Sequence, residues 1–196
     1  MSRHFPNPLV VMALEMEAGT VFKEVGVEVL FTGVGKVNAA HALTRRLAEY
    51  VCANEPLPFV VNFGTAGSGA FRRGSLVVCR AFVQRDMDVS ALNFDVGVTP
   101  YDSVPSRLLF PLVLEDLPQG VCGTGDSFAV SHEDASYDVL DMEAFALAKV
   151  CWLYESRFIS VKYITDNADS GAASDWQQSA HEVADQFLQI YKRVNG

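Results

Sequence analysis

The sequence predicts an α/β protein, a three-layer α/β/α sandwich in which helices cover both faces of a mixed central sheet. Short apolar runs of strand length alternate along the chain with segments whose apolar residues have helical spacing. Hydrophobic residues make up 49% of the 196 residues and charged residues 20%, which suits a sizeable buried core. No repeat, low-complexity segment or linker divides the chain, so we expect one domain over residues 1–196.

The predicted strands are short, apolar segments rich in Val, Leu and Phe, with turn residues at their ends. Near-continuous apolar runs of this kind indicate strands that are buried on both faces. The segments are Leu9–Ala13, Val27–Thr32, Phe59–Phe63, Ser75–Val83, Gly120–Thr124 and Phe158–Ile164.

Three segments are predicted as helices, and one long segment as a loop. Asn38–Tyr50 has its apolar residues on one helical face, Val139–Tyr154 is a long apolar helix, and a final helix runs from about Asp175 to Val194. Gln84–Pro105 is rich in Asp, Asn, Gly and Pro and shows neither period. A loop of about 20 residues inside a compact domain is usually functional or part of an interface.

The charge balance argues against two classes of partner. The chain has 15 Lys and Arg against 24 Asp and Glu, a formal net charge of −9, and a pI of about 4.8. Cationic side chains in no cluster neutralise few phosphates, so we expect neither nucleic-acid binding nor attachment to an anionic membrane. No apolar run approaches the roughly 20 residues that a membrane span needs. The polar segment Met1–Pro8 lacks the layout of a signal peptide, which predicts a cytoplasmic protein.

Cysteines and histidines give no sign of a metal or a bound cofactor. The four cysteines form no CxxC pair and lie in or beside apolar stretches, which predicts buried free thiols. The four histidines are scattered, whereas zinc needs ligands at clustered spacings. We therefore expect neither a metal site nor a cofactor. The cysteines are Cys52, Cys79, Cys122 and Cys151.

Two glycine-containing segments follow predicted strands. In GVGK at 33–36, a P-loop would need glycine at Leu30 and Ser or Thr at Val37, and a GxGxxG motif would need glycine at Asn38. A tight turn is the better interpretation there. In GTAGSG at 64–69, small residues let backbone N–H groups approach a ligand, but they suit a plain strand-to-helix turn equally well.

Acidic residues stand at the ends of several predicted elements. Ligands of open α/β sheets gather outside strand ends, so carboxylates there can converge on one site, although each alone is more often a cap or a solvated charge. Glu143 is the most informative, because a carboxylate on the mostly apolar predicted helix is seldom fully buried without a partner. The acidic residues are Glu15, Glu17, Asp126, Asp141, Glu143, Asp166 and Asp169.

Six segments form a pattern over nearly the whole chain: VVMALEMEA at 10–18, TGVGKVNAA at 32–40, NFGTAGS at 62–68, TGDSF at 124–128, DMEAFALAKVC at 141–151 and ITDNAD at 164–169. In this order and rough spacing they resemble the nucleoside phosphorylase superfamily. The resemblance is greatest to its hydrolytic branch, the 5′-methylthioadenosine/S-adenosylhomocysteine nucleosidases. It implies a nucleoside phosphorylase-like fold and hydrolysis of a purine nucleoside to adenine and a free sugar, in purine and methionine salvage.

The resemblance also implies the roles of the reacting groups. Asp166 matches the aspartate that protonates N7 of the purine, and Thr165 matches the hydroxyl residue that helps to orient it. Glu17 matches the glutamate that binds and activates the attacking water. Met142 and Glu143 match the pair that holds the ribose, with the glutamate accepting the sugar hydroxyls.

The remaining matched positions surround the nucleoside. Phe128 matches the aromatic residue that stacks on the base, and the backbone of Ala129 would face the base edge. Thr65 and Gly67 match positions near the water and the sugar, and Leu14 matches a position beside the ribose. Trp176 lies near an aromatic position that covers the 5′ substituent. Leu92 and Pro100 match positions where a neighbouring subunit closes the pocket, which implies a homodimer.

The nucleophile and the substrate leave alternatives. The phosphorylase branch carries a glycine-aspartate-proline segment and a nearby arginine after its first strand, whereas Ala13–Glu17 has neither. A carboxylate there would repel phosphate, so hydrolysis is favoured over phosphorolysis. The alternatives are a hydrolase of another purine nucleoside such as futalosine or adenosine, a phosphorylase, and a non-catalytic nucleoside-binding protein. Asp141 for glutamate, Lys162 for arginine and Trp176 for phenylalanine depart from the family's pattern and leave the 5′ substituent open.

Overall fold

The computed structural model describes residues 7–111, 114–129, 131, 132, 134–169, 172, 176 and 183–195. Within these ranges, eight strands form one mixed sheet. The strands are β1 (Leu9–Met12), β2 (Val29–Phe31), β3 (Val60–Gly67), β4 (Leu76–Gln84), β5 (Arg107–Leu109), β6 (Gln119–Thr124), β7 (Val139–Asp141) and β8 (Phe158–Asp166). The helices are α1 (Glu15–Ala18), α2 (Val21–Glu24), α3 (Lys36–Cys52), the 3₁₀ turn η1 (Ser90–Leu92), α4 (Ala144–Leu153) and α6 (Ala184–Asn195).

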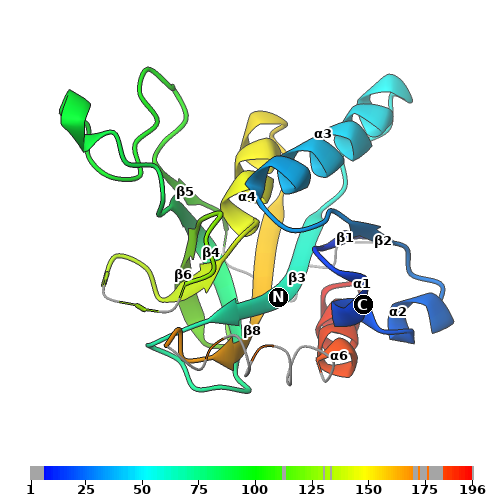
Figure 1. Ribbon diagram of the computed structural model, residues 1–196. Coiled ribbons are helices and arrows are strands. Elements are labelled where there is room, and N and C mark those ends of the chain that lie inside the picture. Colours follow the sequence, from blue (N-terminus) through cyan, green and yellow to red (C-terminus); the bar gives the residue numbers. More distant parts are fainter. Residues whose placement is uncertain are drawn as a thin grey trace.

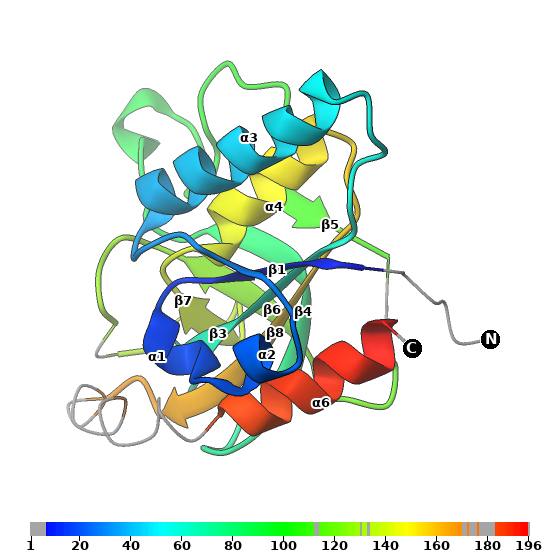
Figure 2. The same cartoon turned by 90° about the vertical axis from the view of Figure 1, so that its right-hand side faces the viewer.

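The helices cover both faces of the sheet, which confirms the predicted three-layer arrangement. Helices α3 and α4 pack together on one face, and α1, α2 and α6 lie together on the other (Figures 1 and 2). None of the helices in the described part of the chain combines the length and the apolar character needed to cross a membrane.

The strands fall into two groups that run in opposite directions. β2, β1, β3 and β8 are parallel to one another, and so are β4, β6 and β7. The groups join where β8 pairs antiparallel with β4, and where β3 meets β7 at the single pair Gly67–Leu140. The pairings β3–β8–β4–β6–β7–β3 therefore close a ring, and this closure brings carboxyl ends of both groups to the same place.

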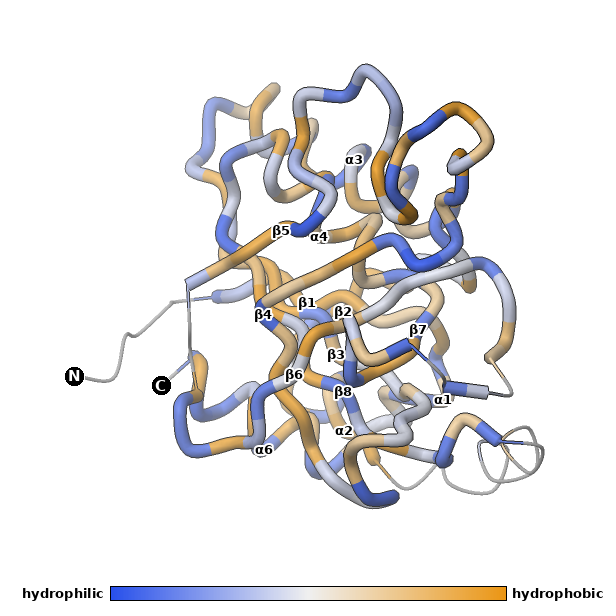
Figure 3. Tube along the Cα trace, turned by 90° about the vertical axis from the view of Figure 1, so that its left-hand side faces the viewer, coloured by the Kyte–Doolittle hydropathy of each residue, from blue (hydrophilic) through white to orange (hydrophobic). Residues whose placement is uncertain are grey.

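The period-2 alternation of the strands divides the core into two clusters. In β1, Leu9 and Val11 pack with α3 and α4, whereas Val10 and Met12 pack with α2 and α6. On the second side, the ring of Phe187 from α6 stacks on Phe63 of β3, with ring centroids 5.0 Å apart. In Figure 3 the strands at the centre of the trace carry mostly the colour of hydrophobic residues.

One predicted helix is wrong at its start. Val139–Asp141 forms strand β7, paired parallel with Cys122–Thr124 of β6, and α4 begins only at Ala144. The carboxylate of Asp141 accepts the N–H of Ala144 at 2.8 Å, so it acts as a cap and separates strand from helix. Glu143 therefore precedes α4 and does not lie inside a helix as predicted.

Smaller differences concern the ends of elements and one thiol. The predicted start of the last helix at Asp175 lies outside the described residues, and α6 extends to Asn195. Short elements α1, α2 and β5 were not predicted, while the predicted loop Gln84–Pro105 is confirmed except that Gln84 ends β4 and Ser90–Leu92 forms η1. All four cysteines are free, but Cys52, at the end of α3, is exposed rather than buried as expected.

Candidate active site

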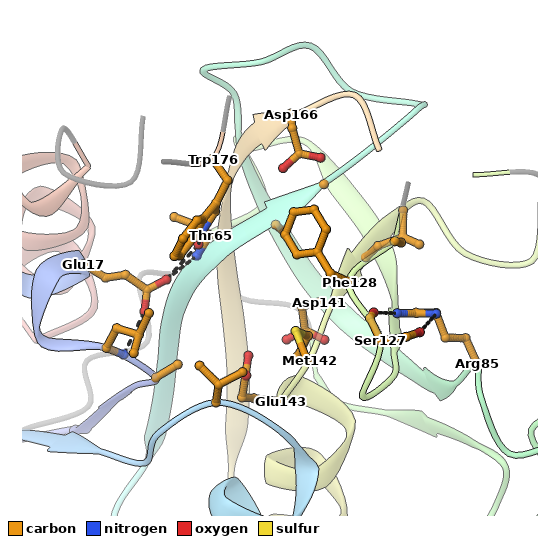
Figure 4. A pocket seen from close by; sticks show the side chains of 17 residues that line it. Glu17, Thr65, Arg85, Ser127, Phe128, Asp141, Met142, Glu143, Asp166 and Trp176 are labelled. Carbon is orange, nitrogen blue, oxygen red and sulfur yellow. Dashed lines mark hydrogen bonds between the residues drawn. The ribbon is translucent and has the colours of Figure 1, made fainter. Parts of the chain in front are cut away.

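A pocket of about 330 Å³ lies where the carboxyl ends of the two strand groups meet (Figure 4). Four carboxylates line it, together with two aromatic side chains and several small residues. Apart from Trp176, these side chains come from the end of a strand or from the segment that follows it, which is where open α/β folds place their ligands. The carboxylates and aromatics are Glu17, Asp141, Glu143, Asp166, Phe128 and Trp176.

Glu17 is buried and held from two sides. It occupies the third position of α1, the short helix after β1, and its Oε2 accepts the N–H of Leu14 at 3.1 Å, as in a helix capping box. Its Oε1 accepts both the N–H and the hydroxyl of Thr65 in β3, at 2.8 and 2.9 Å. These bonds fix the carboxylate against the sheet, with one edge toward the pocket.

Asp166 is the last residue of β8 and is also buried. Its Oδ2 accepts the hydroxyl of Thr165 at 2.8 Å, and its Oδ1 accepts the N–H of Ala168 at 2.9 Å. Gly67 of β3 lies against it so closely that a Cβ there would be 2.6 Å from Oδ1. Glycine is therefore required at 67, because any side chain would displace the carboxylate.

Glu143 is positioned by the glycine turn that precedes α3. Its Oε1 accepts the N–H of Gly35 at 2.8 Å, and Gly35 has φ +95°, a conformation that side chains disfavour. The turn at 33–36 is thus a tight turn as predicted, and it also orients a carboxylate of the pocket. Burial, reinforced by the negative charge of Asp141, raises the pKa of Glu143 to about 7, although Lys162 opposes the shift.

Asp141 lines the pocket and pairs with a buried lysine. Nζ of Lys162, on β8, lies 2.8 Å from its Oδ2, and the hydroxyl of Thr124 donates to its Oδ1 at 2.5 Å. Burial alone would raise the pKa of Asp141, but the positive charge of Lys162, together with the hydrogen bonds from Lys162, Thr124 and the N–H of Ala144, outweighs burial and lowers the pKa. Burial likewise disfavours the charge of Lys162, but the carboxylate of Asp141, with a further contribution from Glu143, raises the pKa of the lysine.

The opposite wall carries the aromatic side chain expected to bind a base. Phe128 follows β6, its side chain is 46% exposed, and it lines the pocket. Arg85, at the end of β4, donates to the hydroxyl of Ser127 at 3.2 Å and to its carbonyl oxygen. The buried Nε of Arg85 has no hydrogen-bond partner among the described residues. The two hydrogen bonds from Arg85 to Ser127 hold the backbone segment from which Phe128 projects (Figure 4).

The pocket brings together most of the residues predicted from the sequence. Thr165 is not among the lining residues but donates a hydrogen bond to Asp166. Leu92 and Pro100 lie on the loop Gln84–Pro105, which we call the outer loop, away from this pocket. Arg85 and Ser127 were missed as site residues, and so was the role of Asp141 and Lys162. The predicted residues that line the pocket are Leu14, Glu17, Thr65, Gly67, Phe128, Ala129, Met142, Glu143, Asp166 and Trp176.

The fold and the pocket define an α/β protein of the nucleoside phosphorylase type. The sequence profile described as the phosphorylase superfamily matches residues 4–194, and the chain belongs to that superfamily.

The chain is also similar to several individual proteins. A 5′-methylthioadenosine/S-adenosylhomocysteine nucleosidase of Bacillus pumilus is 28% identical over 199 residues, covering 89% of this chain and 84% of the relative. The nucleosidase of Neisseria meningitidis in complex with methylthio-immucillin-A has a TM-score of 0.80 at 23% identity, covering 95% of this chain and 96% of that one. Futalosine hydrolase of Helicobacter pylori has a TM-score of 0.82 at 19% identity, covering 97% of each chain. The two structural likenesses establish the fold.

The pKa of Glu143 predicts a pH-dependent stability. Because the folded-state value of about 7 is above the ordinary value of 4.5, the native protein holds a proton that the unfolded chain has lost between these pH values. Stability should therefore fall as the pH rises from about 4.5 to 7. Glu143→Gln, which is always neutral and keeps an acceptor for Gly35, should be more stable than the parent at pH 8 by about 1–3 kcal/mol.

Urea unfolding of both proteins at pH 8 and pH 5 measures this effect. The difference should shrink toward pH 5, and Glu15→Gln, at an exposed position of α1, should show no comparable change. An equal difference between Glu143→Gln and the parent at both pH values would contradict the prediction.

Proposed function

We propose that this protein is a purine nucleosidase that hydrolyses the N-glycosidic bond of 5′-methylthioadenosine or S-adenosylhomocysteine. The products are adenine and a free sugar. The observation that carries the proposal is the convergence of Glu17, Glu143 and Asp166 on one pocket with Phe128. In Figure 4 the three carboxylates enter it from different sides. Curated relatives with this enzymatic name align over most of the chain.

Asp166 is proposed as the proton donor. Adenine is a poor leaving group as an anion, so its N7 must gain a proton as the bond to the sugar breaks. Thr165 donates to one carboxylate oxygen and the N–H of Ala168 to the other, which orients the group at the pocket wall. Gly67 leaves room for the carboxylate next to the substrate.

Glu17 is proposed as the base that activates water. The reaction passes through a sugar with oxocarbenium character, and water must reach the face opposite to the leaving base, as in inverting glycoside hydrolysis. Glu17 enters from the side of β1 and β3, whereas Phe128 enters from the side of β6. This placement suits a water on one side of the sugar and a base on the other.

The remaining residues are proposed to bind the substrate. Glu143 accepts hydrogen bonds from the ribose hydroxyls and supports the positive charge that grows on the ring, and Met142 packs against the sugar. Phe128 stacks on the purine, with the backbone of Ala129 at its edge. Leu14 and Trp176 line the part of the pocket near Glu17, where the 5′ end of the sugar is expected.

Phosphate is the less suitable nucleophile in this pocket. A phosphate site needs cations that are free to bind a dianion, whereas Lys162 already pairs with Asp141 and Arg85 donates to Ser127. The carboxylate of Glu17 occupies the place where phosphate would have to approach, and it would repel the dianion. Hydrolysis is therefore favoured over phosphorolysis.

The products of the reaction test this function directly. The protein is incubated with methylthioadenosine, S-adenosylhomocysteine, adenosine, inosine and futalosine, each with and without phosphate, and the products are identified by chromatography and mass spectrometry. We expect adenine and a free sugar from the first two substrates at a rate that does not depend on phosphate. A requirement for phosphate with a sugar-1-phosphate product would overturn the hydrolase assignment.

Substitution of Asp166 separates the acid from the residues that bind. Asp166→Asn keeps size and hydrogen-bonding capacity but removes the proton, so kcat should fall by at least about 10²-fold while KM changes little. Phe128→Ala should mainly weaken binding, by about 1–3 kcal/mol, and Glu143→Gln should affect both kcat and binding. Circular dichroism confirms that each variant is folded. Near-parental turnover in folded Asp166→Asn would refute the donor role.

The outer loop predicts a homodimer. Leu92, Val96 and Tyr101 expose 65%, 57% and 96% of their surface, and apolar side chains so exposed on a long loop indicate an interface. We propose that this loop, with Leu92 and Pro100, closes the pocket of a second copy. Leu92→Glu should then shift the protein toward monomer in light scattering and lower kcat/KM. A fully active monomer at micromolar concentration would contradict this.

A further inference from the structure

Trp176, Thr65 and Glu17 form a chain of hydrogen bonds on one wall of the pocket. Nε1 of Trp176 lies 2.9 Å from Oγ1 of Thr65, and that oxygen lies 2.9 Å from Oε1 of Glu17 (Figure 4). All three residues line the pocket, and Trp176 is partly buried while Glu17 is only 3% exposed. The indole is thus linked to the proposed base through one hydroxyl.

The chemistry of the three groups fixes the direction of this chain. An indole N–H can only donate, a carboxylate can only accept, and a hydroxyl has a single proton to donate. The hydroxyl of Thr65 must therefore accept from Trp176 and point its own proton at Glu17. Without the indole N–H, this proton would be free to rotate toward another acceptor in the pocket.

This arrangement makes the two oxygens of Glu17 unequal. Oε1 accepts the hydroxyl and the N–H of Thr65, the latter at 2.8 Å. From the residues that the structure describes, Oε2 accepts only the N–H of Leu14, at 3.1 Å. Since a carboxylate has about four lone-pair sites, Oε2 keeps the larger remaining capacity. It is the oxygen best able to take a proton from a water molecule.

We propose that Trp176 is a positioning residue for hydrolysis: its indole N–H fixes the Thr65 hydroxyl against Oε1 of Glu17, so that Oε2 is presented to the attacking water. The inference rests on the proposed function and adds to it a residue that does not touch the reacting atoms. Phenylalanine, the residue that the nucleosidases resembling this chain carry near position 176, has no hydrogen-bond donor and could not fix the Thr65 hydroxyl. The role therefore belongs to the tryptophan of this chain.

The charged groups around Glu17 do not depend on the indole. Among the described residues, the ionisable side chains that line the same pocket are Asp141, Glu143, Asp166 and Arg85, while Lys162 lies near Glu17 at Gly64 and Glu15 is on the same short helix. Exchange of tryptophan for phenylalanine removes no charge and keeps an aromatic ring. A loss of rate in that variant would thus come from the missing donor or from altered packing.

A double-mutant cycle separates these two causes. Trp176→Phe should lower kcat for methylthioadenosine about three- to tenfold, the range that corresponds to the net effect of one neutral hydrogen bond, with little change in KM. In a Thr65→Val background, which lacks the hydroxyl, the same exchange should have almost no further effect. Equal losses in both backgrounds, or no loss at all, would overturn the proposal. Trp152→Phe, an exposed position on α4, is the control and should leave kcat unchanged.

A second measurement does not depend on activity. The chain has two tryptophans, so the Trp152→Phe variant assigns the indole N–H resonance of Trp176 in a proton–nitrogen NMR spectrum. In Thr65→Val this resonance should move upfield and exchange faster with solvent, and an unchanged resonance would overturn the proposal. If the parent cleaves no nucleoside, the proposed function fails, whereas active parent protein with an additive cycle rejects only the role of Trp176.

Discussion

A buried ion pair between Lys162 and Asp141 joins the two strand groups beneath the pocket. Lys162 belongs to β8 and Asp141 to β7, and these strands run in opposite directions within the closed ring. Asp141 also caps α4 and accepts the hydroxyl of Thr124, so strand, helix and pocket share one carboxylate. Glu143 lies two residues further on, and its position follows from that of Asp141.

The ion pair contributes more to the position of the pocket residues than to the stability of the folded protein. Removing two charges from water costs free energy that their attraction recovers only when the remaining hydrogen-bonding sites are filled. Asp141 meets this condition through Lys162, Thr124, Cys122 and the N–H of Ala144. Lys162 also lies near Glu17. A Cβ atom added to Gly64 would be 3.1 Å from Nζ of Lys162 and 3.6 Å from Oε1 of Glu17. One cation thus offsets several carboxylates that the pocket brings together.

The parts of the fold that the sequence predicts are those with local causes. Long apolar strands such as Phe158–Asp166 are visible because both faces are buried, and α3 is visible through its period. Strand β7 was missed because its three residues are followed closely by an apolar helix, and pairing with β6 and β3 distinguishes them. Helices α1 and α2, with four residues each, are too short to show a period.

The residues of the candidate site likewise divide into those with a local sequence signal and those whose contacts arise only on folding. Glu17 and Asp166 were found because they follow predicted strands, and Glu143 because a carboxylate is unusual on a mostly apolar predicted helix. All three lie in segments that resemble a known family. The hydrogen bonds of Arg85 to Ser127 and the pairing of Lys162 with Asp141 join residues far apart in the sequence. Such contacts depend on how the ring closes, and the charged loop containing Arg85 offered only a weak signal. The indole bond of Trp176 to Thr65 likewise exists only in the folded chain.

The narrow join between β3 and β7 links occupancy of the pocket to the integrity of the fold. The described strands meet there at one residue pair, Gly67–Leu140, and both residues line the pocket. A nucleoside held by Asp166 on one strand group and by Phe128 on the other would bridge this seam, the single-pair join between the two groups. Its binding energy would then act against separation of the two halves of the sheet, adding about 2.7 kcal/mol at a ligand concentration of 100 times Kd. The empty enzyme should open first along this seam, so the substrate that the protein consumes would also protect it from unfolding.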